Sequence, residues 1–95
     1  MIEMIERRVR IMNRLGLHAR AAALLVRTAN SYQSALRLER ADRTAAADAK
    51  SILSVLMLAA ARGTELLATA DGVDESDAIS ALCELFASGF GENER

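Results

Sequence analysis

Residues 5–30 read IERRVRIMNRLGLHARAAALLVRTAN, and the period of their apolar positions changes once along this stretch. Val9 and Ile11 alternate with arginines, a period of two that predicts a half-buried strand. After a glycine-containing turn, apolar residues recur at helical spacing and predict a helix from His18 to about Asn30. The face of this helix consists of Ala22, Leu25, Val26 and Ala29. The fold therefore starts as a strand, a turn and a helix.

The middle of the chain continues this alternation of strands and helices. Alternating residues predict a hairpin between positions 36 and 47 and a further strand over residues 65–70. The composition of residues 50–62 predicts a second helix. Gly63 follows it, in a position where a left-handed glycine would close the helix.

A third helix is expected after Asp74, which can cap it, and Gly89 and Gly91 are expected to end it. Its buried stripe is predicted to consist of Ile79, Leu82, Cys83 and Phe86. The element order is then β-α-β-β-α-β-α. This order favours an α+β fold in which one sheet carries all the helices on one face, within a single domain that spans residues 1–95.

Composition excludes several classes of protein. The chain has 95 residues, 52% of them hydrophobic, and a formal net charge of -1, so bulk attraction to nucleic acid does not organise it. Its only cysteine, Cys83, excludes an internal disulfide and a multi-thiol metal site. The longest apolar run, residues 52–61, is about half of the ~20 residues that a bilayer-spanning helix needs. With no signal-peptide layout at the start, we expect a cytoplasmic protein without membrane insertion.

His18 is the single histidine, and it stands where the first helix begins. A helix start exposes backbone N–H groups and the positive end of the helix dipole, which together favour phosphate. No Ser, Thr, Asp or Asn immediately precedes Ala19, so these donors are expected to serve a ligand or a group carried on His18. Arg20 can add a charge-assisted contact to a phosphoryl oxygen. Imidazole suits reversible phosphoryl exchange, but an isolated histidine here can also be a simple cap or a surface residue.

Several segments together carry a resemblance to a known family: Gly16-Leu17-His18-Ala19-Arg20, Leu24-Leu25-Val26, Lys50-Ser51-Ile52-Leu53-Ser54-Val55-Leu56, Arg62-Gly63 and the Asp-rich third helix. With these segments the chain resembles the HPr family, the histidine-containing phosphocarriers of the phosphoenolpyruvate-dependent phosphotransferase system. The resemblance implies an open-faced β-sandwich, a four-stranded antiparallel sheet with three helices on one face. The chain departs from many relatives in having Ala21 where they have proline. Because alanine favours helix, we expect the first helix to persist.

The resemblance also implies a function. His18 would accept a phosphoryl group from phospho-enzyme I and pass it to an enzyme IIA-type protein, with Arg20 as the phosphate partner. The chain would then be a carrier without a cofactor or metal, and its partners would be the enzymes. It would serve sugar uptake, a regulatory nitrogen-type system, or both, and we expect a monomer.

Ser51 stands before an apolar helix, where its hydroxyl can cap backbone N–H groups. By resemblance, Lys50-Ser51-Ile52 also matches the segment that an HPr kinase/phosphatase phosphorylates in many bacteria. The two roles can coexist. An alternative function is therefore a regulatory binding module that acts through Ser51 and the second helix on a transcription factor or a kinase.

The second helix is apolar on nearly every side, so part of it should remain exposed in a domain of this size. We expect that part to form an apolar patch with a basic rim that includes Arg20 and docks partners near His18. The predicted partner-binding residues are Leu17, Ala22, Ala23, Arg27, Lys50, Ile52, Leu53 and Leu56. A nucleic-acid partner is not expected, because the three aromatic residues follow no strand pattern on which bases could stack.

Overall fold

Within residues 4–92, which the computed structural model describes, four strands and three α-helices alternate in the predicted order. The strands are β1 (Ile5–Arg10), β2 (Ala35–Arg40), β3 (Ala46–Asp48) and β4 (Glu65–Asp71). The helices are α1 (Ala19–Asn30), α2 (Ile52–Leu56) and α3 (Glu75–Ala87), and a 3-10 turn, η1 (Gly89–Gly91), follows α3.

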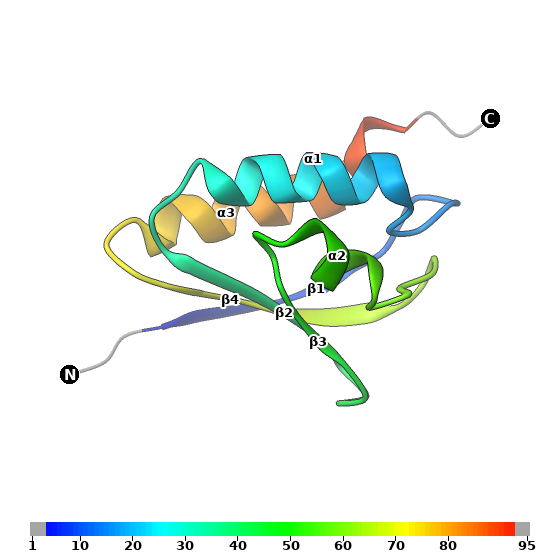
Figure 1. The fold of residues 1–95 in the computed structure, drawn as a ribbon, viewed down its shortest axis with the longest axis horizontal. Coiled ribbons are helices and arrows are strands. Elements are labelled where there is room, and N and C mark those ends of the chain that lie inside the picture. The colour runs from blue at the N-terminus through cyan, green and yellow to red at the C-terminus, as the bar shows by residue number, and fades with distance from the viewer. Residues whose placement is uncertain (1–3, 93–95) are drawn as a thin grey trace.

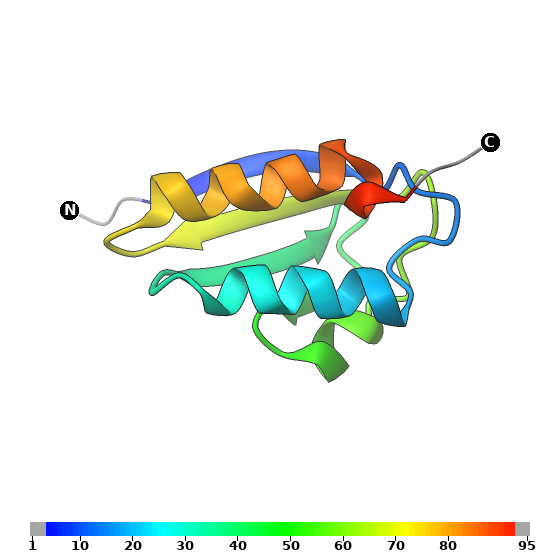
Figure 2. The ribbon, with the colours of Figure 1, turned by 90° about the horizontal axis from the view of Figure 1, so that it is seen from above.

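The strands form one antiparallel sheet in the order β1-β4-β2-β3. Val9 lies opposite Leu66, and Leu38 lies between Ala68 and Ala47, so these buried side chains share one face. Figures 1 and 2 show α1 and α3 side by side over that face, with α2 beside them. The described part of the chain leaves the other face open. The predicted α+β fold, an open-faced sandwich with the helices on one face of the sheet, is confirmed.

The core lies between the sheet and the helices, and many of its residues are small. On α1, Ala22, Leu25 and Ala29 are buried as the helical period predicts, while Val26 is partly buried. Ala21 is also fully buried, and α1 extends unbroken from residue 19 to residue 30. The expectation that this helix persists with alanine in place of proline is confirmed.

The second helix is shorter than the composition predicts. It ends at Leu56 rather than at residue 62, and Ala59 has a positive φ of 50°. The chain beyond α2 makes backbone hydrogen bonds with the segment that joins β1 to α1. The Gly63 N–H donates to Ile11 O at 2.8 Å, and the Ile11 N–H donates to Thr64 O at 2.9 Å. The predicted helix boundary is therefore wrong, because tertiary hydrogen bonds outweigh helix propensity in residues 57–63.

The third helix is confirmed, but the role of Asp74 differs from the prediction. Its side chain makes no cap hydrogen bond to α3. The carboxylate instead accepts from the backbone N–H groups of Gln33 and Ser34 and from the Ser34 hydroxyl. The Ser34 hydroxyl, followed by the Gln33 N–H, lowers the pKa of Asp74. Asp74 therefore ties the start of α3 to the entry of β2.

The buried face of α3 matches the predicted stripe in most positions. Ile79, Leu82 and Phe86 are buried, whereas Cys83 is only partly buried. The helix ends at Ala87, just before the two glycines that were expected to end it. The ring of Phe90, in η1, packs edge-on against Phe86 with centroids 5.2 Å apart. This contact anchors the chain beyond α3 to the core.

Candidate functional site

A tight loop between β1 and α1 positions His18. Gly16 in this loop has φ +69°, a left-handed conformation that glycine adopts without steric penalty. The Leu17 N–H donates to the carbonyl oxygen of Ala60 at 2.9 Å, so the loop packs on the segment that follows α2. A Cβ atom on Gly16 would lie 2.5 Å from that same oxygen. Glycine is therefore required here, and it sets the position from which His18 enters the helix.

The imidazole of His18 caps the helix that it precedes. Its Nδ1 accepts a hydrogen bond from the backbone N–H of Arg20 at 3.4 Å. This is longer than the ~2.7–3.2 Å of ordinary N–H···O bonds, so the interaction is weak. The His18 side chain is 28% exposed, which leaves the ring accessible from solvent. The sequence left open whether the first-turn donors stay free for a ligand or are capped by the histidine, and in the structure His18 itself caps one of them.

A carboxylate from the other end of the chain completes the site. Glu92 Oε2 lies 2.5 Å from Nε2 of His18 and 3.0 Å from an Arg20 guanidinium nitrogen. The Asn13 side-chain amide donates to Glu92 Oε1 at 3.0 Å and to Gly16 O at 2.8 Å. Both Asn13 contacts are to acceptors, which fixes the orientation of that amide. The site thus joins the β1–α1 loop, the first turn of α1 and the residue after η1.

The Glu92 carboxylate is ionised in this environment. The hydrogen bond from His18 is the largest cause and, with those from Asn13 and Arg20, lowers the pKa of Glu92 to about 2, against the opposing effect of burial. A carboxyl whose pKa falls on folding stabilises the folded state above its unfolded value of 4.5. That stabilisation is lost as the pH falls from 4.5 towards 2. Near neutral pH, the imidazole therefore faces a full negative charge.

Arg20 is occupied by the C-terminal segment. One guanidinium nitrogen donates to the carbonyl oxygen of Phe90 at 2.6 Å and to Glu92 Oε2. The side chain is nevertheless 53% exposed. Arg20 lies beside the ring, as predicted. Its guanidinium group is on the Nε2 side, because it binds the same Glu92 oxygen that contacts Nε2. Its contact with a phosphoryl group on His18 stays a prediction.

Sequence reasoning missed Glu92 and Asn13 as site residues. Glu92 is 74 positions from His18 in the sequence, so no local periodicity connects them. The chain returns to the ring because three consecutive residues, Gly89, Phe90 and Gly91, have positive φ values of 61°, 58° and 71°. The glycines signalled the end of a helix, but they carried no information about the direction of the chain beyond it.

Ser51 caps α2, as one of its two interpretations predicts. Its hydroxyl oxygen accepts from the Ser54 N–H at 3.3 Å, and the residue is partly exposed. Phosphorylation of Ser51 stays a prediction.

The exposed part of the second helix is confirmed. Ile52, Leu53 and Leu56 are exposed, with Leu53 at 66%, whereas Val55 faces the core. Met57, which the prediction omitted, is even more exposed. We call these four exposed side chains, Ile52, Leu53, Leu56 and Met57, the α2 patch.

Other predicted docking residues divide between surface and core. On α1, Ala23 and Arg27 are exposed, as a surface role requires. Leu17 and Ala22 are buried, so their side chains cannot form part of a docking surface, and the prediction is wrong for these two. Both residues were predicted to dock partners because they are close to His18 in the sequence. In the structure, the Leu17 side chain points into the core and Ala22 lies on the core face of α1.

Lys50 has a structural partner. It is half-buried, and its ammonium group donates to the carbonyl oxygen of Tyr32 at 2.8 Å. Its own carbonyl oxygen accepts from the Asn30 side chain at 3.1 Å. Lys50 therefore links the end of α1 to the segment before α2, in addition to any part in a basic rim.

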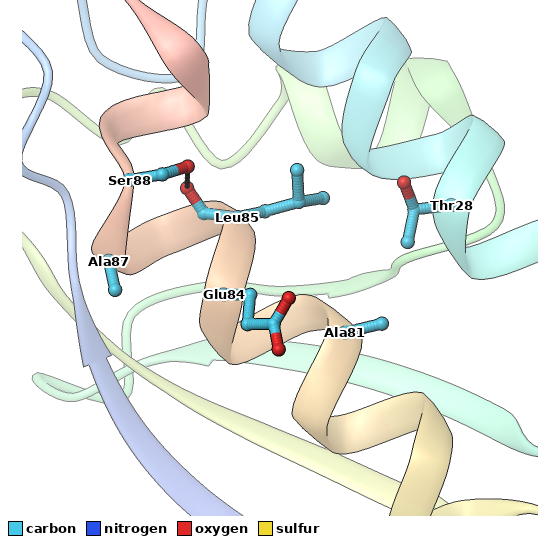
Figure 3. A pocket seen from close by; sticks show the side chains of 6 residues that line it. All are labelled: Thr28, Ala81, Glu84, Leu85, Ala87 and Ser88. Atoms are coloured by element: carbon cyan, nitrogen blue, oxygen red, sulfur yellow. Dashed lines mark hydrogen bonds between the residues drawn. The ribbon is translucent and has the colours of Figure 1, made fainter.

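The pocket drawn in Figure 3 lies apart from these groups. It is a surface groove of about 660 Å³ between α1 and α3, and Thr28 faces α3 across it. Its lining residues are Thr28, Ala81, Glu84, Leu85, Ala87 and Ser88, none of which belongs to the predicted site. Within residues 4–92, no cluster of His, Cys, Asp or Glu could hold a metal ion. No helix in this range has the length and hydrophobicity needed to cross a membrane.

Known proteins resemble this chain over nearly its whole length. A family model described as the PTS HPr component phosphorylation site matches residues 5–88. The phosphocarrier protein HPr of Cupriavidus necator is 45% identical over 96% of this chain and 100% of its own length. The phosphocarrier protein NPr of Proteus mirabilis is 44% identical over 92% of this chain and 96% of its own. A crystal structure of HPr from Thermoanaerobacter tengcongensis superposes with a TM-score of 0.88 at 39% identity, covering 95% and 99% of the two chains.

Proposed function

Since this chain belongs to the HPr family of phosphotransferase-system phosphocarriers, we propose that Nδ1 of His18 is the atom that accepts and releases the phosphoryl group. One observation carries this assignment. Nδ1 is an acceptor towards the first-turn N–H of Arg20, so its lone pair is unprotonated and is held only by a long, weak bond. Nε2, in contrast, is covered by the Glu92 carboxylate.

The environment of Nδ1 suits a phosphoryl group. A group bonded to Nδ1 would lie beside the N-terminus of the 12-residue helix α1, where first-turn N–H groups and the helix dipole favour anions. Arg20 is exposed enough to move its guanidinium group from Phe90 O to a phosphoryl oxygen. In this proposal the chain binds and presents the group, and the partner proteins catalyse its transfer.

The proposed donor is phospho-enzyme I and the proposed acceptor is an enzyme IIA-type protein, with the exchange in the cytoplasm. The experiment that tests this combines the protein with phosphoenolpyruvate, Mg²⁺ and enzyme I, followed by intact-mass measurement. We expect a gain of one phosphoryl group that is lost in mild acid, as a phosphoramidate requires. An unmodified mass, or a modification that survives acid, contradicts the proposal.

The α2 patch is proposed to dock both partners, because it is exposed and apolar and has Arg27 on the neighbouring helix α1. Leu53→Glu should raise the KM for phosphorylation by enzyme I about 10-fold or more, since a charge replaces an exposed apolar contact. Stability should change by less than about 0.5 kcal/mol, because Leu53 is largely solvated. Steady-state phosphorylation kinetics and thermal unfolding measure the two effects.

Val73→Glu is the matched control for this prediction. Val73 is 86% exposed and lies in the turn between β4 and α3. Figure 1 shows this turn at the opposite end of the molecule from the start of α1, which His18 caps. Its KM should equal that of the unsubstituted protein. Equal KM values for Leu53→Glu and Val73→Glu would show that the α2 patch does not dock enzyme I.

Ser51 is proposed as a regulatory position, because its partly exposed hydroxyl lies directly beside the α2 patch. Ser51→Asp should raise the KM for enzyme I about 5-fold. The family resemblance implies acidic partner surfaces, and these would repel the added negative charge. Aspartate is a good N-cap, so α2 should keep its stability. The measurement is again the KM, with Ser80→Asp on the exposed side of α3 as the control.

The outcome of this experiment also separates the carrier from the alternative, a regulatory module that acts on a transcription factor or kinase. A Ser51→Asp protein with unchanged kinetics would show that a negative charge here does not regulate transfer. If a variant that cannot accept a phosphoryl group still regulated a transcription factor or a kinase, the result would favour the regulatory module.

A further inference from the structure

Glu92 contacts the acceptor ring on the side away from the proposed transfer atom. Its Oε2 lies 2.5 Å from Nε2, while Nδ1 faces the N–H of Arg20. The carboxylate is itself held by Asn13 and Arg20, and its side chain is only 15% exposed. The Glu92 carboxylate is therefore held in place against the ring and is not a freely moving surface group.

The two contacts together determine the tautomer of the neutral imidazole. The Arg20 N–H can donate to Nδ1 only if that nitrogen carries no proton. The proton then resides on Nε2, where it is donated to the ionised Glu92 carboxylate. A carboxylate that holds a ring N–H in this way fixes both the tautomer and the orientation of the imidazole.

We infer that Glu92 is a positioning residue for phosphoryl transfer: it holds the Nε2 proton so that Nδ1 presents its lone pair, and it balances the positive charge that develops on the ring. This inference rests on the proposed function of His18. Asn13 supports it by holding Glu92 against the ring.

The transfer step needs no movement of this proton. The Nδ1 lone pair forms the new P–N bond, while the bond from phosphorus to the donor breaks and its electron pair leaves with the donor. The ring gains positive charge, and the proton stays on Nε2 opposite the Glu92 carboxylate. In the onward step, the electron pair of the P–Nδ1 bond returns to the ring. The carboxylate thus stabilises the phosphorylated ring in a state from which the group can still leave.

Glu92→Gln tests this role, because glutamine keeps the shape but removes the charge and can either accept from or donate to Nε2. Nitrogen-15 NMR of the His18 ring should show a larger share of the Nδ1–H tautomer than in the unsubstituted protein. The kcat for phosphorylation by enzyme I should fall about 10-fold with KM unchanged. This is far less than the ~10⁴-fold cost of losing the orienting carboxylate of a buried triad, because water reaches this ring.

Two further variants complete the experiment. Glu84→Gln changes the same charge on the exposed side of α3 and should leave ring spectrum and kcat unaltered. Glu92→Asp keeps the charge and should recover most of the lost kcat. An unaltered tautomer in Glu92→Gln, or a kcat that is equal or higher, overturns the inference; a higher kcat would mean that Glu92 competes with the phosphoryl group for Arg20. If the unsubstituted protein accepts no phosphoryl group, the proposed function fails instead.

Discussion

His18→Ala is expected to abolish the acid-labile phosphorylation of this protein completely. The reason is chemical: within residues 4–92 this imidazole is the only one, and no other side chain at the site offers an uncharged nitrogen lone pair. The measurement is intact mass after incubation with phosphoenolpyruvate, Mg²⁺ and enzyme I. Removal of the ring also takes away the weak N-cap of α1 and the contact with Glu92, which together should cost about 1 kcal/mol.

His18→Asn separates the chemistry from this loss of stability. Asparagine is a strong N-cap, so α1 should keep its start, but an amide cannot serve as a phosphoryl acceptor. Both variants should be inactive and both lose the contact with Glu92, so the alanine variant, which also lacks a cap, should be the less stable of the two in thermal unfolding. Acid-labile phosphate on either variant would place the acceptor elsewhere in the chain.

Gly16→Ala is expected to lower the free energy of unfolding by about 2–5 kcal/mol, the largest stability effect that we predict at the site. A left-handed alanine costs about 1–2 kcal/mol. In addition, its Cβ would lie 2.5 Å from Ala60 O and 3.0 Å from Ala61 Cα, and both are backbone atoms that cannot rotate away. The midpoint of thermal unfolding should fall by roughly 10 °C or more in a domain of this size. Phosphoryl acceptance should fall with it, because the loop that presents His18 must shift.

Gly63→Ala is the matched control for this prediction. Gly63 has φ +89°, yet a Cβ there would meet no atom within 4 Å. This variant should therefore lose only the conformational part, about 1–2 kcal/mol. A loss for Gly16→Ala no larger than that for Gly63→Ala would show that the contact with Ala60 does not constrain the loop.

Prediction from sequence succeeded where a local pattern and the tertiary structure agree. The period of two through Val9 and Ile11 and the helical spacing through Leu25 and Ala29 predicted β1 and α1, because each pattern reflects the face that the core buries. The place of His18 at a helix start is also visible in the sequence, and the structure has it there. Its role as the acceptor stays a prediction, because the local pattern alone also allowed a simple cap and the family resemblance decided between the two.

Prediction failed where contacts distant in sequence decide the outcome. Residues 57–62 have a helical composition, but hydrogen bonds such as Leu17 N–H to Ala60 O hold them outside the helix. Asp74 has the sequence context of an N-cap, yet its carboxylate is taken by Gln33 and Ser34. Glu92 reaches His18 only because the topology brings the end of α3 beside the start of α1 (Figure 2). No window of neighbouring residues contains this information.

The place of Glu92 has a practical consequence for anyone who produces this protein. Glu92 touches the ring, so an affinity tag or a fluorescent fusion attached shortly beyond Glu92 would begin close to His18. Figure 1 shows that β1 begins at the opposite end of the molecule from the start of α1. A fusion that precedes β1 is therefore expected to leave the imidazole accessible, and purification handles for transfer assays belong there.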